Sequence, residues 1–163
     1  MTNIYSLADY VVTLKGDRGN NIAGNIPEIS IGGPAESTGL ASSGNGSGFI
    51  GSITISREPD AWSLEGDVTG GFVHNRNLSR IGTVNISINQ VSDKVRQLKT
   101  VMNIVEKTEA VYPFNITVTN AYTNEVVASC SSCLIRKTPN QVFGERATMQ
   151  EWVFNAGVVE FKN

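Results

Sequence analysis

The sequence predicts a mainly β protein, an antiparallel barrel or sandwich with one flanking α-helix and one long loop. Three observations support this fold class. Short runs of alternating apolar and polar residues recur along most of the chain, and this period of two is typical of half-buried strands. Only residues 91–107 carry a helical pattern. Charged residues are sparse, at 17%, while small polar residues are plentiful, which favours a folded sheet protein over a disordered chain.

We expect residues 1–163 to form a single domain. A domain of this size buries about two-thirds of the surface of its unfolded chain, which is enough for one core. The net charge of −2 excludes binding of nucleic acid by bulk attraction. The first residues lack the features of a signal peptide, and no apolar run is long enough to cross a membrane. The sequence therefore predicts a protein that is made and folded in a cytoplasm.

The first half of the chain predicts strands separated by polar turns. Residues 10–15 and 26–31 are β-rich runs on either side of a turn and indicate a hairpin. Residues 49–57 and 81–88 alternate clearly between apolar and polar side chains. Between them the pattern predicts a break at 58–60, an element that starts at Trp62, a strand at 68–73 and a polar turn at 74–77.

Residues 32–48 form a long loop or an extended hairpin rich in Gly and Ser. Six of its 17 residues are Gly and four are Ser, a composition typical of flexible coil. A loop of this length in a compact domain is usually functional or disordered. We expect the segment to become ordered when it meets a neighbouring copy, and disorder is the alternative.

The segment 91–107 predicts the helix, and strands follow it. Apolar residues recur at spacings of four, three, four and three, which places them in one stripe, and Ser92 or Asp93 can cap the first turn. The polar side of the helix carries three cations that face solvent or an acidic partner: Lys94, Arg96 and Lys99. The later strands are predicted at 114–119, at 125–129 and 133–137 (two strands or one bent strand), and at 150–161 with an interruption at Gly157.

The motifs that suggest chemistry are weak. Residues 46–51 spell G-x-G-x-x-G, but coil precedes the motif and a strand follows it, so it does not predict a dinucleotide site. Cys130 and Cys133 are the only cysteines, and with one histidine they are too few for a zinc site. Three interpretations of the pair stay open: inert thiols, a local disulfide that requires a turn between the two residues, or crosslinks between copies.

An acidic cluster surrounds Trp62 and consists of Glu58, Asp60, Glu65 and Asp67. A solvated acidic edge is the simplest interpretation. Paired carboxylates beside an aromatic ring also occur in glycosidases, although no other feature supports an enzyme. A third hypothesis is that the cluster lines a passage for DNA and repels its phosphates, so that the polymer slides without sticking.

Several segments resemble the tail tube proteins of contractile-tailed bacteriophages. The similar segments are 10–14, 64–68, 80–88 with the helix after them, and 150–158. The resemblance implies a structural virion protein, not an enzyme, that needs no cofactor and no metal. Six copies close into a ring, rings stack into a tube inside a sheath, and DNA leaves the capsid through the tube without sequence-specific binding.

The resemblance also implies partners and a location. The partners are further copies of the chain, the tail sheath protein, and baseplate and tail-terminator proteins, with no insertion into a membrane. We expect the protein in the virion tail after assembly in the cytoplasm of the host bacterium. The long loop is the candidate contact between rings, through Gly32, Gly33, Glu36, Leu40, Asn45 and Gly48.

A second interpretation is a binding module. A β-sandwich of baseplate or adhesin type would recognise sugar or protein through Trp62 and the glycine-rich loop. Mass distinguishes the two interpretations, because a tube protein forms rings or filaments and a binding module stays small.

Overall fold

The computed structural model describes residues 6–17, 21–22, 26–32, 50–107 and 113–162. Its first elements are a short 3-10 helix η1 (Leu7–Asp9) and the strands β1 (Tyr10–Gly16), β2 (Asn21–Ile22), β3 (Ile26–Pro27), β4 (Ile29–Gly32), β5 (Ile50–Arg57), β6 (Trp62–Gly66), β7 (Phe72–Arg76) and β8 (Gly82–Asn89). The helix α1 (Asp93–Lys107) follows, and then β9 (Phe114–Asn120), β10 (Val126–Lys137), β11 (Met149–Ala156) and β12 (Val158–Phe161).

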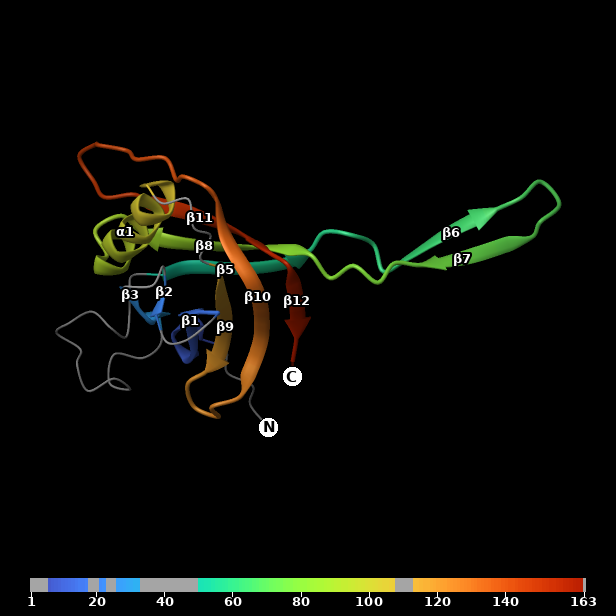
Figure 1. Ribbon diagram of the computed structural model, residues 1–163, viewed down its shortest axis with the longest axis horizontal. Helices are drawn as coiled ribbons and strands as arrows, with labels where there is room; N and C mark the ends of the chain where they lie inside the picture. Colours follow the sequence, from blue (N-terminus) through green and yellow to red (C-terminus); the bar gives the residue numbers. More distant parts are fainter. Residues whose placement is uncertain (1–5, 18–20, 23–25, 33–49, 108–112, 163) are drawn as a thin grey trace.

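The body of the protein is a sandwich-like pair of antiparallel layers (Figure 1). The strands follow the order β4-β1-β9-β10-β11-β8-β5, and β12 also pairs with β10. The long strand β10 belongs to both layers, because its first half pairs with β9 and β12 and its second half pairs with β11. Bulges in a strand allow such a change of layer, and β10 has register shifts at 130–133 and 135–137. The predicted fold class is confirmed as a sandwich, and the sheets formed by the described residues do not close into a barrel.

The predicted strands of the body are confirmed, with small differences at their ends. The hairpin of residues 10–15 and 26–31 appears as β1 paired with β4, and residues 126–137 form one bent strand. β8 shows the alternation of buried and half-buried residues that its sequence predicts. Gly157 separates β11 from β12, as expected.

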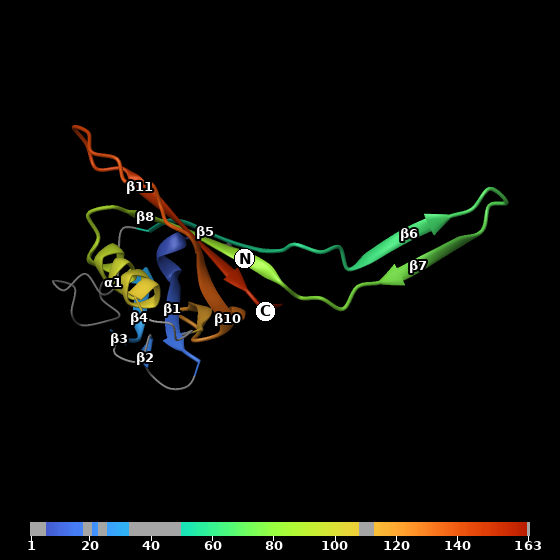
Figure 2. The same ribbon diagram turned by 45° about the horizontal axis from the view of Figure 1, so that its top comes forward.

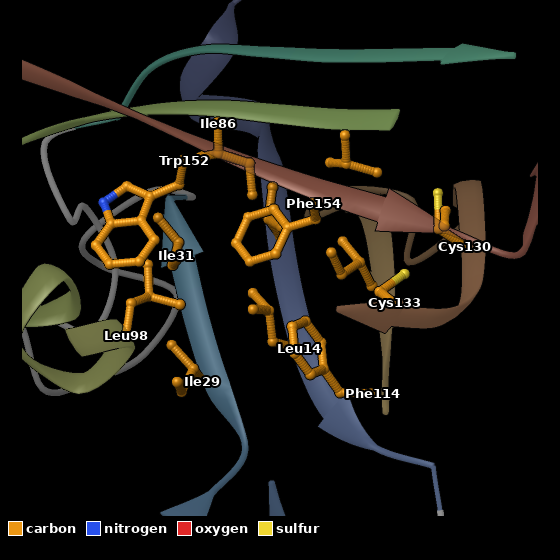
Figure 3. Packing of buried hydrophobic residues seen from close by; sticks show 14 of the residues in the cluster. Leu14, Ile29, Ile31, Ile86, Leu98, Phe114, Cys130, Cys133, Trp152 and Phe154 are labelled. Atoms are coloured by element: carbon orange, nitrogen blue, oxygen red, sulfur yellow. The ribbon is translucent and has the colours of Figure 1, made fainter. Parts of the chain in front are cut away.

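The core lies between the two layers (Figure 3). Trp152 and Phe154 of β11 are fully buried, and the rings of Phe154 and Phe114 meet edge to face at 5.8 Å. Trp152 lies toward Leu98 of α1. The helix therefore covers one open end of the sandwich with its apolar stripe.

The helix begins at Asp93, two residues later than predicted. The Ser92 hydroxyl accepts a hydrogen bond from the backbone N–H of Lys94 at 3.2 Å, which makes Ser92 the cap. Val91 precedes the helix and is exposed. Lys94 is only 5% exposed, and burial lowers its pKa, so it does not belong to an outward basic face. Within the described part of the chain, no helix is long and apolar enough to cross a membrane.

Residues 58–81 form a projecting arm whose outer part is the β6–β7 hairpin (Figures 1 and 2). The expected strand at 68–73 and turn at 74–77 are wrong. The turn lies at residues 67–71, and residues 72–76 form β7. The cause is local, because the Asp67 carboxylate organises the turn and Gly70 supplies a backbone φ of +91° there, which glycine adopts without strain.

Candidate functional site

The arm is a two-stranded ribbon without a third strand. Every described residue from 60 to 81 is exposed, and β6 pairs with no other described strand than β7. An isolated hairpin is at best marginally stable in water, and a third strand or a packing partner is needed to stabilise it. The arm therefore presents an exposed surface of the kind that contact with another molecule would stabilise.

One side of the arm is rich in apolar and aromatic groups. The register pairs Trp62 with Arg76, Leu64 with His74, and Gly66 with Phe72, and paired residues project to the same side of a ribbon. The Arg76 guanidinium lies 5.8 Å from the centre of a Trp62 ring, and the Phe72 and His74 rings meet edge to face at 5.7 Å. We call these five side chains the aromatic face of the arm.

The aromatic face is exposed to an unusual degree. Trp62 is 57% exposed, Leu64 63% and Phe72 70%. Contiguous apolar side chains at the surface mark interaction sites. This face does not follow from the sequence pattern, because the polar residues at 74–77 predict a turn there. With the turn at 67–71, the alternation W-x-L and F-x-H-x-R falls on one side.

The tip of the arm is held by Asp67. One carboxylate oxygen, Oδ1, accepts hydrogen bonds from the Thr69 hydroxyl at 2.7 Å, from Gly71 N–H at 2.8 Å and from Thr69 N–H at 2.9 Å. These bonds lower the pKa of Asp67, with the Thr69 hydroxyl as the largest cause. Because the pKa is lowered, the bonds to the ionised carboxylate stabilise the turn fully at pH values above the ordinary pKa of an aspartate. This stabilisation is lost as the pH falls through the lowered pKa.

The four acidic candidates are spread along the arm. Glu58 lies at its root, where its N–H donates to the Ile81 carbonyl at 3.1 Å. Asp60 follows, and Glu65 lies opposite Val73 on the side away from the aromatic face. Asp67 is at the tip. The structure therefore places them along one projection and not around one point.

Within the described residues, the sheet that carries the arm has an unpaired edge at each side. Among the described residues, β5 pairs only with β8. On the other side, and counting only the part of the chain that the structure describes, residues 134–137 of β10 pair with β11 alone, because the described part of β9 begins at Phe114, opposite Cys133. Unpaired strand edges are templates for pairing with another chain.

An apolar groove of about 330 Å³ runs beside the open part of β10. Its floor consists of Val101, Met102, Val105, Phe114 and Ile135, and Arg136 and Lys137 line it on the β10 side. Three of these residues come from α1, so the groove lies between the helix and the strand edge.

The two cysteines are free and fully buried. They lie on either side of the β10 bulge, where Ser132 has a φ of +53°. The bulge turns both side chains toward the core (Figure 3), although residues three apart in a straight strand face opposite sides. Burial raises the pKa of Cys130 to about 11 and that of Cys133 to about 12. Thiols in this state are poor nucleophiles, which agrees with the inert interpretation.

We expect both thiols to resist modification in the folded protein. A disulfide reagent at pH 8 should titrate neither thiol in native protein and both in denaturant. Because each folded pKa lies above the unfolded value of 9.0, stability should fall as the pH rises from about 9 toward 12. Rapid titration of a native thiol at pH 8 would contradict the buried placement.

The remaining candidates occupy no enclosed site. His74 and Trp62 are on the arm, and the hollow at the arm's root is open and lined by polar groups such as Asp60, Ser63 and Asn75. Within the described part of the chain, no three His, Cys, Asp or Glu residues cluster so that they could hold a metal ion.

Of the candidate inter-ring residues in the long loop, only Gly32 is described. Gly32 is the last residue of β4, with a φ of +85°. The other loop candidates, Gly33, Glu36, Leu40, Asn45 and Gly48, lie outside the described residues.

Comparisons with known proteins identify one family and several structures of similar fold. The family model described as bacteriophage PhiTE tail tube protein matches residues 28–162. No curated protein matches the chain.

Solved structures with a similar fold come from contractile injection systems. One is a chain of the sheath-tube complex of an extracellular contractile injection system, PVC, in its extended state; its TM-score is 0.54 at 14% identity, over 96% of this chain and 90% of that one. Another is from the sheath/tube terminator of the same system, at 0.54 and 12%, over 99% of each chain. A third is from the anti-feeding prophage baseplate, at 0.55 and 11%, over 100% and 98%. At such identities the likeness concerns the fold.

Proposed function

The chain belongs to the bacteriophage PhiTE tail tube protein family, whose model matches most of its length, and on this premise we propose that its copies form stacked hexameric rings through which phage DNA is delivered. The family places the protein in a tail as a structural component. The proposal rests on one observation: the body is well packed, but the edges of its sheet and the arm have no partner among the described residues.

Rings close through the open sheet edges in this proposal. The β5 edge of one copy pairs with residues 134–137 of β10 in the next copy, so that the sheet continues around the ring. This pairing leaves no free edge within the ring. It also covers the apolar groove between α1 and β10.

Rings stack through the arm. The arm projects from one end of the body, and α1 lies at the other end (Figure 1), so an arm that reaches a neighbouring ring makes a head-to-tail contact. Such a contact does not close on itself and extends as a filament. The arm thus has the axial role that the sequence analysis gave to the loop 32–48, and we propose the loop as a second inter-ring contact.

We propose that the acidic residues of the arm face the DNA. Glu58, Asp60, Glu65 and Asp67 add negative charge where arms border the channel, which weakens adhesion of DNA phosphates.

The proposal also includes partner proteins. The proteins of similar fold include components of a sheath-tube complex, a tube terminator and a baseplate. We propose that this chain meets the corresponding sheath, terminator and baseplate proteins in a virion tail, after assembly in the host cytoplasm.

Sedimentation velocity over a concentration series tests the proposal. We expect the 17.5 kDa subunit to give way to a species of six subunits and then to much larger, polydisperse material. A protein that stays a single subunit at every concentration would contradict it and would favour the binding-module interpretation.

A further inference from the structure

We infer that the strand β12 is a clamp for the arm, and that Arg57 is the positioning residue through which β12 fixes the direction in which the arm leaves the body. The inference rests on the proposed function, in which the arm must reach a neighbouring ring. It adds the residues that orient the arm before any contact with another copy. We call β12 together with Arg57 the arm clamp.

The arm can bend near the body. The N–H of Glu58 donates to the Ile81 carbonyl at 3.1 Å, and farther out the N–H of Asn77 donates to the Ala61 carbonyl at 2.8 Å. Between these two bonds the outgoing and returning chains diverge (Figure 1) and belong to no described strand. Exposed chain with few backbone hydrogen bonds opens and flexes easily. The ribbon by itself therefore does not fix the direction of the arm.

The strand β12 contacts both chains of the arm root through one residue. The N–H of Val159 donates to the carbonyl of Arg80, on the returning chain, at 2.8 Å. The carbonyl of Val159 accepts a hydrogen bond from Nε of Arg57, which ends β5 and begins the outgoing chain, at 2.9 Å. The side chain of Val159 is fully buried. Both chains are thus tied to a residue that is itself anchored in the core.

The other edge of β12 is fixed to the body. It pairs in antiparallel register with residues 128–131 of β10. Beyond the ends of this pairing, Gly157 N–H donates to the Ser131 carbonyl at 3.0 Å, and Lys162 N–H donates to the Val127 carbonyl at 2.7 Å. β10 also pairs with β9 and β11, so the arm clamp connects the arm to both layers of the sandwich.

The side chain of Arg57 contributes more to the clamp than that of Arg80. The Arg57 guanidinium makes the partly buried bond to Val159 and lies 5.6 Å from the centre of the Phe161 ring, a distance at which the cation and the ring attract each other. Arg80 pairs with Glu160 at 3.3 Å, but both side chains are about half exposed. An exposed ion pair of this kind contributes little. What Arg80 supplies is its backbone carbonyl.

A fixed direction favours stacking of rings. An arm that swings freely loses this freedom when it binds a neighbour, and the lost entropy opposes the contact. An arm that already points one way avoids most of that cost. The arm clamp therefore prepares the aromatic face for contact while the subunit is still separate.

A distance measurement on separate subunits tests the arm clamp. Val73→Cys places a label on the arm, on the side away from the aromatic face, and Asn103→Cys places a second label on the exposed side of α1. The native cysteines are buried, so spin labels attach to the two new thiols. In dilute, unassembled subunits, pulsed electron paramagnetic resonance should give one narrow distance distribution.

Arg57→Met should remove this narrow distribution and leave a broad one, because methionine keeps an apolar stem but donates no hydrogen bond. Arg80→Met is the matched control: it removes the same charge at the arm root but keeps the backbone bond to Val159, so the distribution should stay narrow. Both variants should keep the thermal midpoint of the doubly labelled parent. Phe161→Leu is a second test if Arg57→Met does not fold. Phe161 is 57% exposed, and loss of its ring should also broaden the distribution.

Assembly provides a second measurement. Loss of a hydrogen bond from a charged donor changes an equilibrium constant by about tenfold, and we expect Arg57→Met without labels to raise the protein concentration needed for tube growth by about this factor. A distribution that stays narrow in Arg57→Met and Phe161→Leu would overturn the inference, and so would equal broadening by Arg57→Met and Arg80→Met. Because the distances are measured in separate subunits, neither result bears on tube formation. Failure of the unmodified protein to form any tube would instead count against the proposed function.

Discussion

The substitution Phe72→Asp should abolish stacking of rings and leave the subunit folded. Phe72 is 70% exposed in the free subunit, and its ring meets that of His74 edge to face on the arm. Covering such a side chain contributes about 1.5–3 kcal/mol, and every subunit of a ring makes the contact. Burying an unpaired carboxylate in its place is unfavourable. Electron microscopy should show single rings or small species where the unmodified protein forms tubes.

Asn75→Asp is the matched control for this substitution. Asn75 lies on the same strand, pairs with Ser63 and projects from the opposite side of the arm. The substitution adds the same negative charge to the same exposed ribbon, on the side away from the aromatic face, so tubes should still form. Both variants should keep the thermal midpoint of the unmodified protein. Tubes of normal length from Phe72→Asp would show that the aromatic face is not the stacking contact.

The substitution Gly82→Ala should destabilise the subunit strongly. Gly82 is the first residue of β8, at the root of the arm, and an added Cβ would clash with the Ser56 carbonyl oxygen and come within 2.8 Å of Val159 Cγ2. The first clash is with backbone, so it cannot be relieved by rotation of a side chain. Overpacking of this kind costs about 3 kcal/mol. Chemical denaturation should show the loss as a lower midpoint with an unchanged slope.

Gly144→Ala is the control for the glycine. A Cβ at this position meets no atom within 4 Å, and alanine reduces the entropy of the unfolded chain, so the unfolding midpoint should not fall. If Gly82→Ala were as stable as the unmodified protein, β5 and β8 would not approach each other as closely at the arm root as the structure indicates.

The body of the fold was predictable from sequence because its signals are local. β8 alternates over eight residues with one face buried, and such alternation fixes which side of the strand faces the core. The stripe of α1 likewise follows from the helical period. These patterns identified the class, the helix and the strands of the sandwich.

The arm was less predictable because its residues have no core to face. Polar residues at 74–77 resemble a turn by composition, yet 74–76 belong to β7. The position of the turn depends on the hydrogen bonds of the Asp67 carboxylate and on the positive φ of Gly70. A count of turn-forming residues does not show either of them. The aromatic face appears only once the register of β6 and β7 is known.

The open edges and the placement of the cysteines could not be predicted, because both depend on distant pairing. Nothing in residues 134–137 shows that β9 ends before reaching them. The C-x-x-C spacing predicted opposite faces for Cys130 and Cys133 in a straight strand, and the bulge overrides it. Likewise, the acidic residues are close in sequence, but the extended arm separates the root from the tip.

Electron microscopy of the purified protein at high concentration tests the central claim most directly. If the subunit completes its sheets with identical neighbours, the images should show hollow tubes of stacked rings, with a continuous sheet on the inner wall and the arms reaching from one ring to the next. Separate compact particles at every concentration, each with its arm uncovered, would contradict the account.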